Sequence, residues 1–277
     1  MHWQTTRFRI DLTRPQVMGI VNVTPDSFSD GGAHVSAAAA IAHCEQLLAE
    51  GADLLDLGGE STRPGSLPVS IEEELARVLP VLDAALTLGC PVSVDTNKAE
   101  VMTVALSRGA DIVNDINALQ ASGAIDAVAV HPSCGVCLMH MRGTPESMQR
   151  RPHYEDVIDE VAAFLREREA ALTARGVAPE RIVVDPGIGF GKSVAHNVEL
   201  LRRQRELLAL GRPLLAGWSR KSTLGAITGR EVGQRQAASV AAALAAVHLG
   251  ARIVRVHDVA ATVDALKVWQ AAGLLHG

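Results

Sequence analysis

Polar side chains recur just after short apolar runs along this 277-residue chain. Each one alone has an ordinary structural explanation, since Asp95 could cap a helix and Asp185 could form a turn with Pro186. Together they are hard to explain by packing, because most of the runs end in a group that can hydrogen-bond a ligand. The set comprises Asn22, Arg63, Asp95, Asn114, Asp115, His140, Asp185, Lys221, Arg255 and His257.

Two kinds of chemistry are represented in this set. Arg63, Arg255 and His257 suit an anion such as pyrophosphate, because the planar arginine fork matches phosphate oxygens. The amide oxygen of Asn22 could hold a metal ion. The other residues suit a flat heterocycle with an amidine-like edge, since carboxylates accept from N–H groups, Asn does both, and Lys donates to a ring carbonyl. These residues are Asp95, Asn114, Asp185 and Lys221, with Met139 as a soft apolar face for the ring.

The elements that must position these groups follow a repeated pattern: a helix, a glycine, a short apolar strand and a polar residue. Glycine is expected just past a helix end, and continuously apolar strands are typical of strands buried on both faces. Counting 17–21 as the first, about eight strands alternate with helices, which favours a closed (β/α)8 TIM barrel over an open doubly wound sheet. Helices are expected at 37–50, about 70–88 (with a capping box from Ser70 and Glu73), 97–108, 124–130, 154–175, 197–210, 235–249 and 260–272.

One domain is expected, because no linker or low-complexity segment divides the chain. Residues 17–277 form the barrel in this prediction, and residues 1–16 form a short strand or hairpin that could plug one end of it. Phe8 and Ile10 alternate with polar residues there, as in an exposed strand.

Composition narrows the function classes. A net charge of −5 argues against nucleic-acid binding. No apolar run is long enough for a signal segment or a membrane span. The four cysteines are Cys44, Cys90, Cys134 and Cys137; two of them lie in or beside predicted buried strands and one in a predicted helix. These features predict a cytoplasmic protein with reduced thiols.

The ordered motifs of the chain resemble those of bacterial dihydropteroate synthases. Two long loops carry the resemblance most strongly, and shorter motifs follow in the same order over nearly the whole chain. The loops are Asn22-Val-Thr-Pro-Asp-Ser-Phe-Ser-Asp-Gly-Gly32 and Gly58-Gly-Glu-Ser-Thr-Arg-Pro-Gly65, and the shorter motifs include Asp185-Pro-Gly-Ile-Gly-Phe-Gly-Lys192, Ser219-Arg-Lys-Ser222 and Arg255-Val-His-Asp258.

The resemblance implies a transferase of folate synthesis that joins 4-aminobenzoate to a dihydropterin carrying a pyrophosphate leaving group, with Mg²⁺. It implies catalytic roles for Asp95, Asp185, Lys221 and Arg255, and pterin binding by the first three with Asn114. Asn22, Thr62, Arg63, Arg255 and His257 would hold pyrophosphate and its metal, and Phe28, Pro64, Phe190 and Ser222 would form the aminobenzoate pocket. It further implies sulfonamide inhibition and a homodimer. We also hypothesise that the two long loops close over the bound pterin, because the glycines at 31, 32 and 65 provide flexible flanks.

Other motifs carry weaker signals. Cys134 and Cys137 form a CxxC without a second pair, which gives little support for a zinc or redox site. Residues 187–193 resemble a nucleotide-binding loop, but Pro186 stands where the first glycine is required. His140 is interpreted as a core histidine. Two alternatives stay open: a related barrel that transfers methyl groups from methyltetrahydrofolate, and a catalytically silent pterin-binding paralogue.

Overall fold

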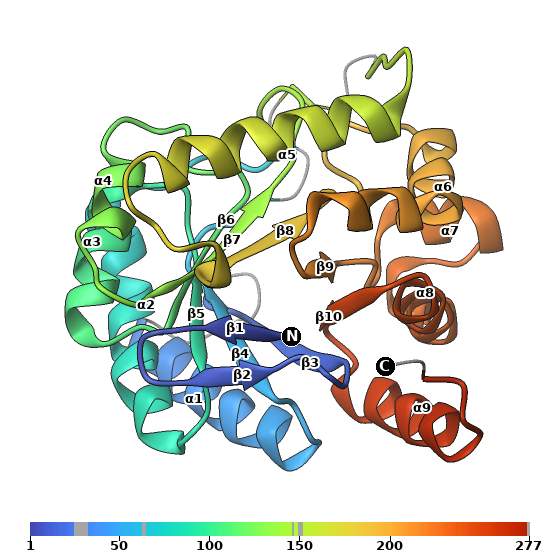
Figure 1. The fold of residues 1–277 in the computed structure, drawn as a ribbon. Coiled ribbons are helices and arrows are strands. Elements are labelled where there is room, and N and C mark those ends of the chain that lie inside the picture. Colours follow the sequence, from blue (N-terminus) through green and yellow to red (C-terminus); the bar gives the residue numbers. More distant parts are fainter. Residues whose placement is uncertain (25–32, 63–64, 146, 149–151, 276–277) are drawn as a thin grey trace.

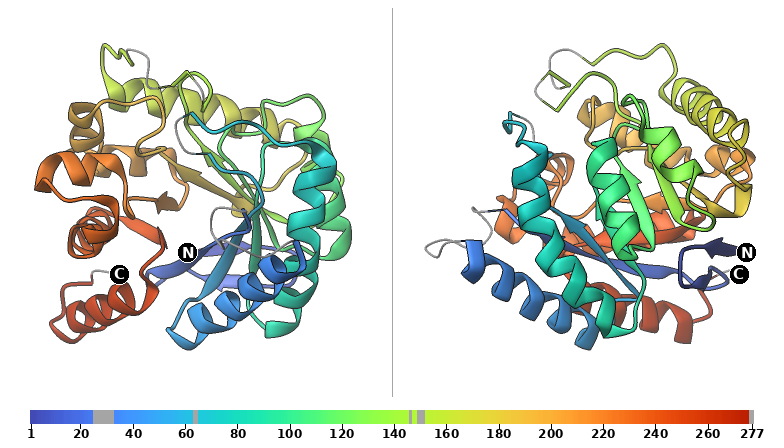
Figure 2. Two further views of the ribbon diagram at one scale, coloured as in Figure 1. Left: turned by 180° about the vertical axis from the view of Figure 1, so that it is seen from behind. Right: turned by 90° about the vertical axis from the view of Figure 1, so that its left-hand side faces the viewer.

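The computed structural model describes residues 1–24, 33–62, 65–145, 147–148 and 152–275. Eight parallel strands form a closed barrel in the order β10-β3-β4-β5-β6-β7-β8-β9, so the predicted (β/α)8 barrel is confirmed. Helices surround the strands on the outside (Figures 1 and 2). The barrel strands are β3 (Gln16–Asn22), β4 (Leu54–Gly58), β5 (Val92–Asp95), β6 (Ile112–Asp115), β7 (Gly135–Met139), β8 (Ile182–Asp185), β9 (Leu214–Ala216) and β10 (Ala251–Val256).

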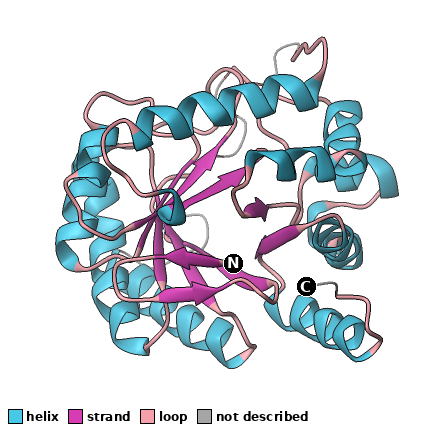
Figure 3. Ribbon diagram, in the orientation of Figure 1, coloured by secondary structure: helices cyan, strands magenta, loops and turns pink. Residues whose placement is uncertain are grey.

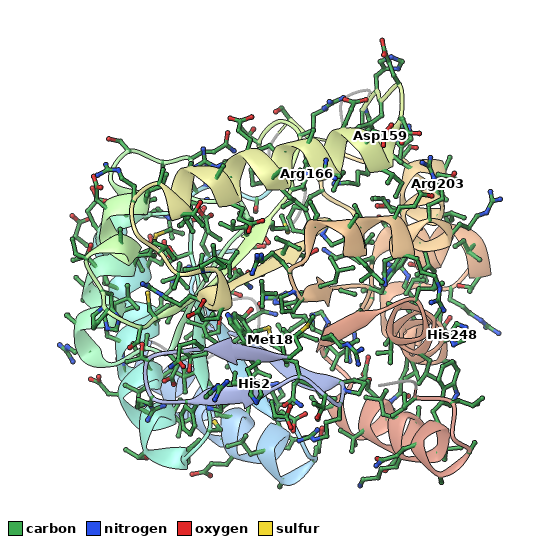
Figure 4. The ribbon with its side chains drawn as sticks, in the orientation of Figure 1. His2, Met18, Asp159, Arg166, Arg203 and His248 are labelled. Carbon is green, nitrogen blue, oxygen red and sulfur yellow. The ribbon has the colours of Figure 1, made fainter. Side chains whose placement is uncertain are left out.

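A two-stranded antiparallel hairpin precedes the barrel, formed by β1 (His2–Gln4) and β2 (Arg9–Asp11). Trp3 is fully buried, packs in one cluster with Met18 and Leu54 of the barrel, and donates from Nε1 to the carbonyl of Arg181 at 2.9 Å. Figure 4 labels His2 on the hairpin and Met18 on β3. The hairpin therefore covers the barrel end at which the strands begin. The domain boundary at residue 16 stays a prediction.

Helices form the outer layer, drawn in cyan in Figure 3 around the magenta strands. The α-helices are α1 (Ala33–Ala49), α2 (Ile71–Ala85), α3 (Ala99–Arg108), α4 (Ala124–Ala129), α5 (Val157–Thr173), α6 (Val194–Arg202), α7 (Ser222–Thr228), α8 (Gln236–His248) and α9 (Val259–Ala271). Short 3-10 segments are η2 (Leu86–Leu88), η3 (Pro179–Arg181), η4 (Gln204–Leu210) and η5 (Val232–Gln234).

Two local predictions need correction. The single helix expected over 197–210 is α6 followed by the 3-10 segment η4, because the chain departs from helical geometry at Arg203. The capping box at the start of α2 is only half formed. Ser70 accepts from the backbone N–H of Glu73 at 3.1 Å, but the carboxylate of Glu73 pairs with Arg77 one turn later.

All four cysteines are buried and free of disulfide bonds. Within the described residues, no helix combines the length and apolar character needed to cross a bilayer. Cys134 lies against Arg181, whose Nη2 donates to its sulfur at 3.0 Å, and Cys137 lies in the same cluster as Trp3.

Candidate functional site

The site lies at the barrel end where the strands finish. Because the strands are parallel, their carboxyl ends meet at one rim, and six of the strands end in a predicted site residue or directly beside one. The structure brings together most of the residues predicted from the sequence. Those at or near the rim are Asn22, Asp95, Asn114, Met139, Asp185, Lys221, Arg255 and His257.

Arg255 is the central cation of the rim. Its Nη2 donates to Oδ2 of Asp95 at 2.7 Å, and its Nε donates to Oδ2 of Asp56 at 2.6 Å. The same Asp56 oxygen accepts from Nδ2 of Asn114 at 3.1 Å. Strands β4, β5, β6 and β10 are thus joined by one network. The nearby carboxylates raise the pKa of Arg255, although its burial acts in the opposite direction.

Asp56 is the member of this network that sequence reasoning missed. It lies in the middle of β4 within the apolar run Leu54–Gly58, and it is fully buried. Its Oδ1 has no hydrogen-bond partner in the part of the chain that the structure describes. The sequence does contain a sign of this role, because Asp56 lies inside an apolar strand that is buried on both faces. A carboxylate in such a place needs a cation, a hydrogen-bond donor or a ligand as its partner.

Burial disfavours the ionised form of both predicted catalytic carboxylates, Asp95 and Asp185. It raises the pKa of Asp95, against the attraction of Arg255. It also raises the pKa of Asp185, against a hydrogen bond from the backbone N–H of Gly187 and the attraction of Lys221. The ionised forms of both groups are therefore costly unless a cation or an N–H donor approaches them.

Lys221 follows β9, the strand that pairs with β10 of Arg255, so it lies at the same rim. Burial, with Arg255 next, lowers the pKa of Lys221 to about 8. Its Nζ lies 4.1 Å from the ring centroid of Phe190. Ser222 is the first residue of α7 and directly follows Lys221. The two predicted aminobenzoate contacts within the described residues, Phe190 and Ser222, are thus both next to Lys221.

His257 follows β10 and is held by Ser219. Its Nδ1 lies 3.0 Å from Ser219 Oγ, and its backbone N–H donates to the same oxygen at 3.1 Å. Burial, with Arg255 next, lowers the pKa of His257 to about 3. The imidazole is therefore neutral at pH 7 and can offer a ligand a hydrogen bond, but not a positive charge.

The loop after β4 is tied down at its base. Lys98 pairs with Glu60 and with Glu74, at 2.5 Å in the second case. A small cavity of about 10 Å³ lies beside this cluster, and Thr62 and Asp95 are among the residues that line it. The predicted contacts Phe28, Arg63 and Pro64 lie outside the described residues.

Comparison with known proteins gives a consistent result. The family described as pterin-binding enzymes matches residues 18–257. A dihydropteroate synthase of Neisseria meningitidis serogroup B is 55% identical over 278 residues, covering 98% of each chain. Two solved structures superpose with TM-scores of 0.93 over 99% of both chains: Yersinia pestis dihydropteroate synthase with a sulfonamide drug complex, 46% identical, and Xanthomonas albilineans dihydropteroate synthase with 4-aminobenzoic acid, 53% identical.

Proposed function

The chain belongs to the dihydropteroate synthase family of pterin-binding enzymes, and we propose that the rim described above carries the reaction of that family in this protein. The reaction condenses a dihydropterin methyl diphosphate with 4-aminobenzoate to give 7,8-dihydropteroate and pyrophosphate. The observation that carries the proposal is the network of Asp56, Arg255, Asp95 and Asn114, which lies at the same rim as Asp185 and Lys221. The methyltransferase alternative loses support, because the relatives carry the synthase name over almost their full length.

The pterin is the substrate that this network fits. Asn114 uses its Nδ2 on Asp56, so its amide oxygen is left to accept from a ring N–H. Asp185 uses Oδ1 on Gly187, so Oδ2 is left for the amino group of the ring. Asp95 accepts from a second ring donor, Lys221 donates to the ring carbonyl, and buried Met139 packs against the ring.

Pyrophosphate and its metal would lie between the pterin and the two long loops. Arg255 and neutral His257 offer hydrogen-bond donors there, together with Thr62 and Arg63. Asn22 Oδ1 and Asp95 Oδ2 both flank Gly58, each 4.0 Å from the position that a Cβ on this glycine would occupy. The described residues contain no cluster of three acidic, His or Cys ligands. A single amide oxygen fits Mg²⁺, which typically completes its shell with water and substrate phosphates.

Catalysis in this proposal is electrostatic and positional. The C–O bond to pyrophosphate breaks, positive charge develops on the pterin methylene, and the aminobenzoate amine forms the new C–N bond and releases a proton to solvent. Asp95 and Asp185 hold negative charge near the developing cation, and Arg255 binds the leaving anion. Mg²⁺, when bound, would offset the charge of the pyrophosphate.

The second substrate would enter beside Lys221. Phe190 forms one wall beneath the lysine, and Ser222 at the start of α7 lies within reach of the benzoate carboxylate. Phe28 and Pro64 complete the pocket in this proposal. A sulfonamide would occupy the same pocket, and the Yersinia pestis relative was solved with such a drug. We also expect a homodimer, as the family resemblance implies, and a cytoplasmic location, as the composition and cysteines of the sequence suggest.

Pyrophosphate release from the pterin substrate with Mg²⁺, with and without 4-aminobenzoate, tests the proposal. Release that requires 4-aminobenzoate and yields dihydropteroate is expected, with loss in Lys221→Ala. Lys267→Ala, at an exposed lysine of α9, is the matched control and should keep wild-type activity. Tight pterin binding without release would instead identify a catalytically silent paralogue.

A further inference from the structure

The loop that joins β8 to α6, residues 186–193, packs very tightly against the residues after β7. Gly187, Gly189 and Gly191 all have positive φ, at 70°, 83° and 64°. A Cβ on Gly187 would collide with the carbonyl oxygen of His140, and one on Gly191 would collide with that of Arg142. The loop is thus built with glycine where its backbone meets another backbone.

Lys192 is buried inside this loop, with 2% of its surface exposed. Its Nζ donates to the carbonyl oxygens of Gly187 at 2.9 Å, Phe190 at 3.0 Å and His140 at 3.3 Å. It also lies 2.8 Å from Nδ1 of His140. No ion pair of Lys192 with a carboxylate is found among the described residues.

A buried lysine bonded mainly to backbone is an unusual arrangement. Removing an ammonium group from water is costly, and the cost is normally offset by a carboxylate. Here four acceptors, the three carbonyl oxygens and Nδ1 of His140, surround an amino group that has at most three N–H donors, and burial lowers the pKa of Lys192 well below its usual value. Burial lowers the pKa of His140 to about 2, so its neutral imidazole can accept at Nδ1. The bonds therefore fix the path of the loop.

Two proposed substrate contacts depend on that path. The N–H of Gly187 donates to Oδ1 of Asp185 at 2.7 Å, which orients the carboxylate. Phe190, whose carbonyl Lys192 holds, presents its ring to Lys221. The same short loop thus carries one pterin contact at its start and one aminobenzoate contact near its end.

We propose that Lys192 is a positioning residue of the rim, whose amino group ties the β8–α6 loop to the end of β7 and thereby orients Asp185 and Phe190 toward the two substrates. The inference rests on the proposed function, because it assigns Lys192 a part in substrate binding. The loop has two other buried anchors, Tyr154 to the carbonyl of Gly191 and Asn197 to the N–H of Gly189, both at 2.9 Å. These anchors bond Gly189 and Gly191, whereas Lys192 bonds Gly187 and Phe190.

Lys192→Met tests the proposal, because it keeps the length of the side chain and removes all three donors. We expect KM to rise about tenfold or more for both substrates with a smaller change in kcat, since a displaced contact weakens binding strongly. Hydrogen exchange of a peptide covering 186–193 should be faster than in wild type. The control is Trp3→Phe, which loses one buried hydrogen bond at the opposite end of the barrel and should leave both KM values within about twofold.

Wild-type KM values and exchange rates in folded Lys192→Met would overturn the inference. If that variant does not fold, Lys192→Gln replaces it, because its two N–H donors can satisfy at most two of the three carbonyls. Its KM values must still rise at least about threefold, and unchanged values would equally overturn the inference. An inactive wild-type enzyme would instead count against the proposed function, so the two failures are distinguishable.

Discussion

Asp56 offers the sharpest test of how the rim holds Arg255. A single carboxylate oxygen, Oδ2, accepts from Arg255 at 2.6 Å and from Asn114 at 3.1 Å. In Asp56→Asn, the amide oxygen can occupy the position of Oδ2, so that both hydrogen bonds can remain, while the negative charge is lost and an NH2 group replaces the unpartnered Oδ1. Asp56→Ala removes the charge and both hydrogen bonds.

The expected magnitudes follow from these bonds. A hydrogen bond to a charged group contributes about 1.5–3 kcal/mol, and because Arg255 stays charged in Asp56→Asn we expect about half of this, roughly 1–1.5 kcal/mol, to be lost with the charge of Asp56. Asp56→Asn should therefore lower kcat/KM for the pterin substrate about tenfold, since about 1.4 kcal/mol is a factor of ten. Asp56→Ala leaves Arg255 and Asn114 without this acceptor, and breaking such a buried pair costs about 3–5 kcal/mol. We expect its kcat/KM to fall by at least about 100-fold.

The assay is initial-rate pyrophosphate release at varied pterin substrate and saturating 4-aminobenzoate, with urea unfolding of each variant. Asp83→Asn is the control, because Asp83 pairs with Arg108 at 2.7 Å with about half of each side chain exposed, and such surface pairs contribute little. If folded Asp56→Ala kept kcat/KM within about twofold of wild type, the view that Asp56 orients Arg255 would be refuted.

Three further outcomes are expected. Burial lowers the pKa of His140 from 6.5 to about 2. Below pH 6.5 the unfolded chain therefore binds a proton that the folded chain does not, and the stability of the fold decreases as the pH decreases. This one group changes the free energy of unfolding by up to about 1.4 kcal/mol per pH unit, so His140→Phe should lose less stability than wild type when the pH is lowered from about 7 to about 5. Equal losses of unfolding free energy for the two proteins, measured with urea, would contradict this. Asp111→Ala deletes a fully buried carboxylate that accepts from Arg7 and from the backbone of Val92 at the barrel end under the hairpin. Its unfolding free energy should fall by about 3–5 kcal/mol with kcat within about twofold, and a large loss of kcat in the folded variant would argue against a purely structural role. A sulfonamide should raise the apparent KM for 4-aminobenzoate without changing kcat. Uninhibited turnover at a fixed, subsaturating concentration of 4-aminobenzoate and a saturating concentration of sulfonamide would contradict the shared pocket.

The fold was largely predictable because its signals are local and repeated. Glycine at the end of a helix followed by a continuous apolar run marks most of the barrel strands, and Gly89 and Gly109 adopt the expected left-handed conformation. Helix ends were harder to predict. The helix expected over 197–210 changes to 3-10 geometry after Arg203, whose side chain binds Glu206 and Asp156, the residue that caps the start of α5. Bonds between segments distant in sequence leave no trace in a periodic pattern.

The site was predictable where a polar residue ends a strand. Asp95, Asn114 and Asp185 fit that rule, and the closed barrel places them at one rim. Asp56 and Lys192 do not fit it. Asp56 lies inside an apolar run, and Lys192 lies in a glycine-rich motif that resembles a nucleotide-binding loop but lacks its first glycine, so no role was expected for Lys192. Their importance depends on contacts that span 199 and 52 positions respectively, which only the folded chain reveals.

The two ends of the barrel differ in how completely their buried charged groups are paired. Under the hairpin, Asp111 accepts from Arg7 and from a backbone N–H, so its charge is well compensated. At the rim, by contrast, Asp56 Oδ1 has no partner among the described residues, and burial raises the pKa of Asp95 while lowering that of Lys221 to about 8. Charges held this way cost stability and are typical of groups that await a ligand. A pterin that donates to the carboxylates and accepts from Lys221 would supply the missing partners, so the same groups that weaken the free protein would bind its substrate.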